Sequence, residues 1–199
     1  MRQMKNKLVA VALLLCLAAT LAGCAKEFTK EEIKEVFPEL VENSFVLNEI
    51  YFGEGFLPCG EAGKESSVYG YYYVKEDQYG FHSISEIKEA TEKIFTPEYA
   101  EILYKTAFDG LATGDTVVTP RYMEGELGIL QSMSAVVYDL ADRSYDYSTL
   151  QITKSSKDRV TVCVETVVDG DRYPVELIVV RYIDTETGER TYRLDSPTY

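Results

Sequence analysis

The sequence has no tryptophan, a single histidine and few basic residues. Its 199 residues include twenty Lys and Arg against thirty-three Asp and Glu, which gives a formal net charge of −13. One imidazole is too few for the usual zinc ligand sets, and no Cys-x-x-Cys pair supplies the missing ligands. Nucleic-acid binding depends on Lys and Arg that neutralise phosphates, so this composition argues against DNA or RNA as a partner. We expect no metal and no other cofactor.

Cysteine is also scarce, and the four cysteines fall into two groups. Cys16 and Cys24 lie within and just after an N-terminal apolar segment, whereas Cys59 and Cys163 belong to the rest of the chain. Cys59 lies in a Pro-Cys-Gly loop, and Cys163 alternates with valines in a predicted strand. Outside the cytoplasm such a pair can persist as a disulfide, but the sequence does not give the Cα separation that a bridge needs. A disulfide between Cys59 and Cys163 therefore stays an open alternative.

The N-terminal segment has the organisation of a secretory signal. Three basic residues precede an uncharged apolar run, Leu8 to Ala22, that ends in small residues. The tetrapeptide Leu21-Ala22-Gly23-Cys24 resembles the lipobox of bacterial lipoprotein precursors. This resemblance implies that residues 1–23 are cleaved off, that Cys24 carries the lipid anchor, and that residues 24–28 tether the protein to the extracytoplasmic face of the cell membrane. The alternative is a retained transmembrane helix, since about 18 apolar residues suffice to span a bilayer.

Residues 29–199 are long enough for one domain with a hydrophobic core. Without residues 1–23, which hold three basic and no acidic residues, the formal charge is −16. Three helices are predicted in the first part of this domain, each from a capping signal: Thr29 with Glu32, Ser83 with Glu86, and Thr96-Pro97-Glu98. Pro38 is expected to kink or restart the first helix.

The later part of the chain changes to a period of two, which predicts strands. The predicted strands are residues 69–74, 116–123, 127–137, 148–153, 160–168, 173–183 and 192–194. Asp169-Gly170 is typical of a hairpin turn between two of them. Apolar residues occupy both faces of strand 173–183, so this strand is expected to be central and covered on both sides.

Helices followed by an antiparallel sheet predict an α+β fold, with N-terminal helices packed on a curved, mostly antiparallel C-terminal sheet. The tandem helix starts at residues 83–87 and 95–99, with the closing segment 192–199, resemble the cystatin-like superfamily, which includes the nuclear-transport-factor-2-like folds. The chain is also similar to uncharacterised lipoproteins of Gram-positive bacteria and, more loosely, to the secreted inhibitor of cell-wall DL-endopeptidases of Bacilli. The likeness covers about residues 69–199. One departure is the lack of a tryptophan in the last strand, where this chain has Thr191-Tyr192.

His82 is the only imidazole, and Asp77, Ser83 and Ser85 lie close to it in the sequence. A Ser-His-Asp arrangement can be written from these residues. A catalytic triad is recognised by the mutual placement of its members, however, and sequence neighbours rarely meet in that geometry. Capping and turn roles already account for Ser83 and Asp77, so we predict no catalytic residue here.

Asp139, Asp142 and Asp146 form an acidic stretch that raises the question of calcium binding. The twelve-residue calcium loop needs oxygen ligands at alternate positions, a central glycine and a closing glutamate, and this stretch does not match that pattern. A solvated, turn-forming acidic loop is the better interpretation.

Tyrosine is the abundant aromatic residue, with sixteen copies, and Tyr71, Tyr72 and Tyr73 are consecutive. Tyrosine offers apolar area with a polar tip, so these three residues are candidates for ligand binding. The alternative, which we favour, is that they are strand residues packed in the core. Consecutive residues of a strand face opposite sides, so at least one of the three rings is expected to lie near the surface.

These observations predict a membrane-anchored extracytoplasmic lipoprotein that acts as a non-catalytic binding module for a protein or a cell-envelope component. The membrane is its first partner, through the lipid on Cys24. Two alternatives stay open. One is an inhibitor of a cell-wall peptidase, suggested only by the resemblance, and the other is a small-ligand carrier or enzyme that uses the cavity common in cone-shaped folds.

Overall fold

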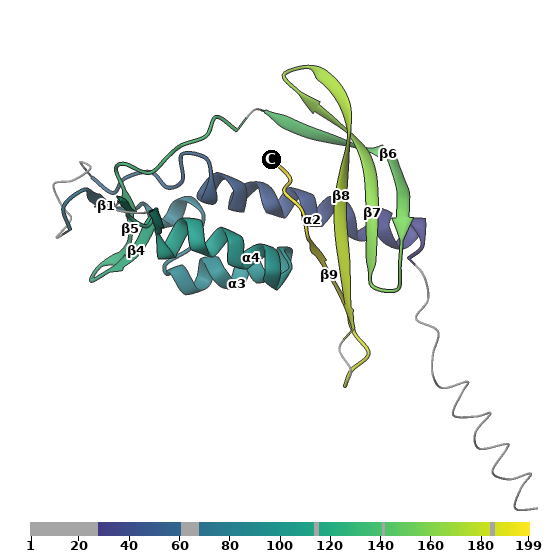
Figure 1. Cartoon of the computed structure of the whole chain (residues 1–199), viewed down its shortest axis with the longest axis horizontal. Helices are drawn as coiled ribbons and strands as arrows, with labels where there is room; N and C mark the ends of the chain where they lie inside the picture. The colour runs from purple at the N-terminus through teal and green to yellow at the C-terminus, as the bar shows by residue number, and fades with distance from the viewer. Residues whose placement is uncertain (1–27, 61–67, 114–115, 141, 184–185) are drawn as a thin grey trace, which may run out of the picture.

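A computed structural model describes residues 28–60, 68–113, 116–140, 142–183 and 186–199 (Figure 1). The predicted signal segment, the lipid anchor Cys24 and nearly all of the predicted tether lie outside the described residues. Within them, the helices lie in the N-terminal half and a four-stranded antiparallel sheet comes last; a separate three-stranded sheet takes one strand from before the last two helices and two strands from after them. The predicted α+β fold class is confirmed.

The first described helix, α2 (Lys30–Tyr51), runs from the large sheet to the other two helices and packs against both (Figure 1). Its predicted capping box is present, because the Thr29 side chain accepts from the Glu32 amide and the Glu32 carboxylate accepts from the Thr29 amide. The helix does not restart at Pro38, one of the two expectations for this residue, since it continues through it. Proline costs a helix interior about 3 kcal/mol, and the burial of Phe37 and Val41 beside it offsets that cost.

The C-terminal sheet consists of four strands in sequential order: β6 (Arg143–Ser155), β7 (Arg159–Val168), β8 (Asp171–Ile183) and β9 (Arg190–Leu194). Asp169 and Gly170 join β7 to β8 with φ values of 52° and 89°. Two positive φ values in a two-residue loop are the geometry of the predicted hairpin. The sheet crosses the N-terminal half of α2 (Figure 1).

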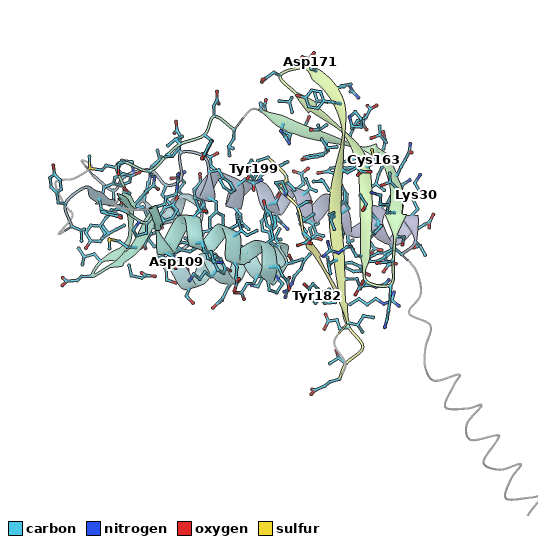
Figure 2. The ribbon with its side chains drawn as sticks, viewed as in Figure 1. Lys30, Asp109, Cys163, Asp171, Tyr182 and Tyr199 are labelled. Carbon is cyan, nitrogen blue, oxygen red and sulfur yellow. The ribbon has the colours of Figure 1, made fainter. Side chains whose placement is uncertain are left out.

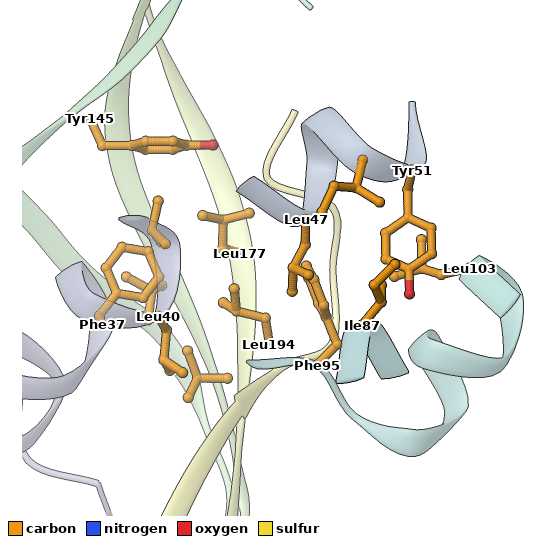
Figure 3. Close-up of a cluster of buried hydrophobic side chains, with 14 of the residues drawn as sticks. Phe37, Leu40, Leu47, Tyr51, Ile87, Phe95, Leu103, Tyr145, Leu177 and Leu194 are labelled. Atoms are coloured by element: carbon orange, nitrogen blue, oxygen red, sulfur yellow. The ribbon is translucent and has the colours of Figure 1, made fainter. Parts of the chain in front are cut away.

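One face of this sheet packs on α2 and is filled with aliphatic side chains. Val160, Val162, Leu177 and Val179 are buried there, and in Figure 3 Leu177 lies close to Leu40 of α2. Strand β8 lies between β7 and β9, as expected for a central strand. The expectation that both of its faces are covered is only partly met, because Ile178 and Val180 on the other face are half-buried. That face lacks the long helix that seals the first one.

The helices α3 (Ile84–Ile94) and α4 (Pro97–Tyr104) pack against the C-terminal half of α2. Ser83 and Thr96 cap them as predicted. The linker between them reaches the large sheet, since the Thr96 amide donates to the Leu194 carbonyl at 2.9 Å. Figure 3 shows Ile87 and Leu103 facing Tyr51 on one side of α2, while Leu194 and Leu177 lie on the sheet side. The buried side chains therefore form one continuous cluster along α2.

The small sheet has the order β1-β5-β4, from β1 (Tyr71–Tyr73), β5 (Gly128–Ser132) and β4 (Tyr122–Gly125). A short hairpin of β2 (Leu111–Thr113) and β3 (Thr116–Val118) precedes β4 in the chain. The single strand predicted for residues 116–123 is thus divided, because Pro120 between β3 and β4 has no N–H for a ladder. The strand predicted for residues 127–137 ends at Ser132. Residues 133–134 form a turn, and residues 135–140 continue as an extended connection toward β6 (Figure 1).

Candidate binding groove

The loop after α2, residues 53–57, is held in place by side chains from distant parts of the chain. Each of its first four carbonyl groups accepts a hydrogen bond from a side chain: Gly53 from Arg121, Glu54 from Gln131, Gly55 from Tyr79 and Gln78, and Phe56 from Tyr72. Gln131 and Gln78 also accept from the Phe56 and Leu57 amides, at 2.8 and 2.6 Å. We call residues 53–57 the clamped loop. Such a loop keeps one conformation before any ligand arrives.

Arg121 is the residue that joins the clamped loop to the extended connection. Its side chain bonds the Gly53 carbonyl on one side and the Val136 carbonyl, at 2.7 Å, on the other. It is only 6 % exposed, and its hydrogen-bond partners within the described residues are neutral. A guanidinium stays charged in proteins, so charge-assisted bonds to carbonyls must satisfy it. Arg121 therefore fixes the spacing between these two segments.

Gly55 shows how tightly the clamped loop is packed. Its φ of +75° lies in the left-handed region that favours glycine. A Cβ atom at this position would stand 2.6 Å from the Gln131 Oε1 atom and would also clash with the Tyr122 hydroxyl. Only glycine fits here, because both the backbone conformation and the space exclude a side chain.

Three adjoining hollows follow the clamped loop and the extended connection. The largest, about 640 Å³, is bordered by the clamped loop, Tyr72, Tyr79 and residues 131–137. The second, about 420 Å³, is bordered by Gly53, Glu54 and residues 137–140. The third, about 250 Å³, lies between α2, Arg143 and the last two residues of the chain. Glu49 borders all three, so they form one surface groove, which we call the acidic groove.

Acidic and aromatic side chains dominate the lining of the acidic groove: Glu49, Glu54, Asp139 and Asp142 with Tyr72, Tyr79, Tyr138 and Tyr199. Within the described part of the chain, no Lys or Arg makes an ion pair with any of these carboxylates. Arg143 lines only the third hollow. Burial raises the pKa of the Tyr79 hydroxyl, and the carboxylates of Glu49 and Glu54 raise it further. The groove is thus a region of unbalanced negative charge.

The structure separates the three tyrosines that the sequence singled out. Tyr71 is buried and donates to the Pro120 carbonyl at 2.7 Å, so it belongs to the core. Tyr72 is half-buried and lines the acidic groove. Tyr73 borders a different hollow of about 310 Å³ beside Cys59. Of these candidates, only Tyr72 lies in the groove.

The two cysteines that could have formed a disulfide are not brought together. Both are free thiols, Cys59 in the exposed loop before β1 and Cys163 half-buried on β7. Figure 2 shows Cys163 in the large sheet, whereas β1 lies at the other end of the molecule in Figure 1. The fold therefore places no bridge between them.

The residues considered for a triad have other partners. The His82 ring is exposed and contacts Glu76 at 2.8 Å, and this hydrogen bond raises the pKa of the imidazole. Ser83 caps α3, and its hydroxyl accepts from the Glu86 amide. Neither Ser85 nor Asp77 is a hydrogen-bond partner of His82 in the described chain. The four residues do not form a nucleophile, base and orienting acid.

The acidic stretch that raised the question of calcium is also divided. Asp139 and Asp142 line different hollows of the acidic groove. Asp146 bonds Ser148 at 2.5 Å and Arg172 at 3.2 Å, and these contacts lower the pKa of its carboxyl group. Across the described ranges, no three His, Cys, Asp or Glu side chains are grouped as metal ligands.

Most groove residues had no signal in the sequence. Glu49 and Glu54 are ordinary acidic residues of a helix end and a loop, and Arg121 and Gln131 are isolated polar residues. The hydrogen bonds of Arg121 and Gln131 to the clamped loop join residues 68 to 77 positions apart in the sequence.

None of the helices in the described residues is both long and apolar enough to cross a bilayer. Comparisons of this chain with protein-family models and with curated proteins find no match.

Proposed function

We propose that this protein is a lipid-anchored, extracytoplasmic, non-catalytic binding protein whose acidic groove holds an extended segment of a partner protein in the cell envelope. The observation that carries the proposal is the groove itself, which a clamped loop and an extended connection build before any ligand is present. Preorganised walls reduce the entropy that binding costs. Free carboxylates and tyrosine rings along them supply contacts for a partner.

An extended segment fits the groove better than a small molecule does. The three hollows follow one another along residues 133–140, and the six residues after the turn span about 20 Å when extended. Small-ligand sites are usually deep enough to bury most of their ligand. The concave face of the large sheet offers no such space, since α2 fills it and Val160 and Val162 are completely buried. These facts weigh against the carrier or enzyme alternative.

The proposed anchor would orient the groove away from the membrane. Residue 28 precedes α2 directly, so a lipid on Cys24 would hold the N-terminal end of this helix close to the bilayer. The 22 residues of α2 span about 33 Å at 1.5 Å per residue. The groove borders the C-terminal half of the helix and would face the cell envelope. Metabolic labelling with a palmitate analogue should mark the mature chain, and Cys24→Ser should remove the label; equal labelling of the variant would contradict the anchor.

A photo-crosslinking experiment tests the binding function. A photoreactive amino acid replaces Val137, which is 51 % exposed on the groove wall, or Ile102, which is 60 % exposed on α4 outside the groove. The full chain is made in the cells from which the sequence comes. We expect a crosslink to a defined segment of one envelope protein from position 137 and not from position 102. Equal crosslinking from both positions, or none from 137, would contradict the proposal.

Inhibition of a cell-wall peptidase is a second candidate function, favoured by one observation. Val136, Val137 and Tyr138 are consecutive, exposed and followed by Asp139, so this apolar stretch could itself enter an enzyme cleft. If the crosslinked partner is a peptidase, titration with the full chain should lower its activity on peptidoglycan. Crosslinking to a peptidase whose activity does not change would leave binding without inhibition.

A further inference from the structure

We infer that the acidic groove recognises Lys or Arg side chains, so that its partner segment is an extended basic peptide. The inference deepens the proposed binding function and rests on it. It commits to one chemical class of occupant, a polypeptide segment whose positively charged side chains enter the hollows beside Glu54 and Asp139.

The negative charge of the groove region complements a basic peptide. By sequence, residues 42–142 hold eighteen acidic and six basic residues, a formal charge of −12. The groove lies in this region, and its carboxylates lack a Lys or Arg partner within the described chain. Arg121 behind the clamped loop and Arg143 in the third hollow offset only two of the four groove carboxylates. A cationic segment would be attracted from a distance and an acidic segment would be repelled.

The tyrosines supply the second argument. Tyr72 and Tyr79 border the largest hollow, and both hydroxyls already donate to carbonyls of the clamped loop, at 3.2 Å each. Their tips are therefore occupied, and what remains for a ligand is the aromatic surface. Cations within about 6 Å of an aromatic ring are attracted by its quadrupole. The same chain already uses this contact on α3, where the Lys88 Nζ atom lies 4.9 Å from the centre of the Tyr104 ring.

The carboxylates of Glu49 and Glu54 line the same hollow as Tyr72 and Tyr79. Burial raises the pKa of Tyr79, and the charges of Glu49 and Glu54 raise it further. One Glu49 oxygen accepts from the Glu54 amide at 2.8 Å, which fixes the carboxylate in the groove. A ring flanked by carboxylates suits an ammonium or guanidinium group with an aliphatic stem, because the stem packs on the ring while the head meets the charge. A lysine or arginine side chain has this form.

Binding of defined peptides to the full chain in a non-ionic detergent tests the inference. The probe is a fluorescent peptide of about ten residues with alternating lysine and threonine, long enough to follow the groove. Matched peptides carry serine or glutamate in place of lysine. The groove variant is Glu54→Gln with Asp139→Asn. The matched control is Glu89→Gln with Glu101→Gln, two exposed acids of α3 and α4 that do not line the groove.

We expect the lysine peptide to bind, and the groove variant to weaken it about tenfold, while the control variant leaves the Kd unchanged. The serine peptide should bind the unaltered protein no more tightly than the lysine peptide binds the groove variant. The glutamate peptide should not bind. An equal loss of affinity in the control variant would mean attraction by general surface charge and would overturn the inference. Absence of binding by the lysine peptide would overturn it too.

A blocked groove separates this inference from the proposed function. Ala135 lines the largest hollow and is half-buried, so Ala135→Trp would fill it. If serine and lysine peptides bind equally well and Ala135→Trp abolishes both, the groove binds peptides without reading charge; the inference then fails and the binding function stands. If the crosslinking at position 137 fails as well, the experiments contradict both the inference and the proposed binding function.

Discussion

The large sheet and the groove region use charged residues in opposite ways. By sequence, residues 143–199 hold ten acidic and eight basic residues, whereas residues 42–142 hold eighteen and six. In the described residues, the Lys or Arg ion pairs start from arginines of the sheet region: Arg159, Arg172, Arg181 and Arg190. The sheet region pairs Asp146, Glu165 and Asp195 with its own arginines, whereas the groove carboxylates have no Lys or Arg partner in the described residues. Unbalanced charge near the groove costs stability through self-repulsion, which is expected where charge serves recognition.

The interiors of the two regions also differ, because the sheet side is apolar and the groove side contains buried polar residues. Valine and leucine side chains fill the space between the sheet and α2, and this packing has no directional requirement. Beside the groove the interior contains Arg121 and Gln131, whose hydrogen bonds fix the clamped loop, and Tyr122, whose hydroxyl accepts from Arg121 and donates to the Ile50 carbonyl. A buried polar network holds one geometry but is costly when one member is lost. The sheet region therefore supplies stability, and the groove region supplies a defined shape.

The largest difference in stability between the two regions is expected when one glycine in each is replaced by alanine. Gly55→Ala introduces a strained φ and a clash with Gln131, and should lower the free energy of unfolding by about 2–5 kcal/mol. Gly170→Ala in the β7–β8 hairpin has a similar φ of +89° but open space around it, so it should cost only about 1–2 kcal/mol. Urea unfolding of both variants measures the difference, which is the contribution of close packing.

Hydrogen exchange of the same two variants locates the damage. Gly55→Ala should speed exchange of the Phe56 and Leu57 amides, which bond to Gln131 and Gln78, without affecting β7. Gly170→Ala should act only near its own hairpin. Equal destabilisation by the two substitutions would show that the clamped loop is not held as tightly as its contacts indicate.

The elements with local signals could be predicted from the sequence. Capping residues Thr29, Ser83 and Thr96 marked the helix starts, and the Asp169-Gly170 turn marked the β7–β8 hairpin, because each signal acts within a few residues. The end of β5 was missed. Residues 133–137 contain strand-forming side chains, but the carbonyl of Val136 bonds Arg121 instead of a neighbouring strand.

The acidic groove could not be predicted from the sequence, for a physical reason. Its shape depends on side chains that reach the clamped loop from four other segments, and no local pattern records which loop a glutamine or arginine will bond. Tyr72 was singled out by its position in a tyrosine run, yet that run also contained a core residue, Tyr71. The acidity of the chain was visible, whereas its division between the two regions required the fold.

A smaller loss of stability is expected at low pH, and it should come from the ion pairs of the sheet region. The Glu32 carboxylate contacts Arg181, Arg190 and Tyr192, which connects α2 to β8 and β9. Partial burial raises the pKa of Glu32, but the hydrogen bonds from Tyr192, Thr29 and Arg181 outweigh it, so the pKa lies below its ordinary value of 4.5. The unfolded chain then binds a proton more readily than the folded one. The stabilisation by Glu32 is present above pH 4.5 and is lost as the pH falls through the lower, folded value.

Glu32→Gln should therefore lower the free energy of unfolding near neutral pH and flatten its fall below pH 4.5. Urea unfolding between about pH 6 and pH 3 measures both effects. Arg181→Met supplies the comparison, because Arg181 is buried against Glu32 and its loss removes the same contact from the other side. The double variant should then show less than the sum of the two single losses, since each one already breaks the pair. If the two losses are additive and the pH dependence of stability is unchanged, Glu32 does not neutralise the arginines of the sheet. The contrast with the unpaired carboxylates of the groove then loses its clearest example.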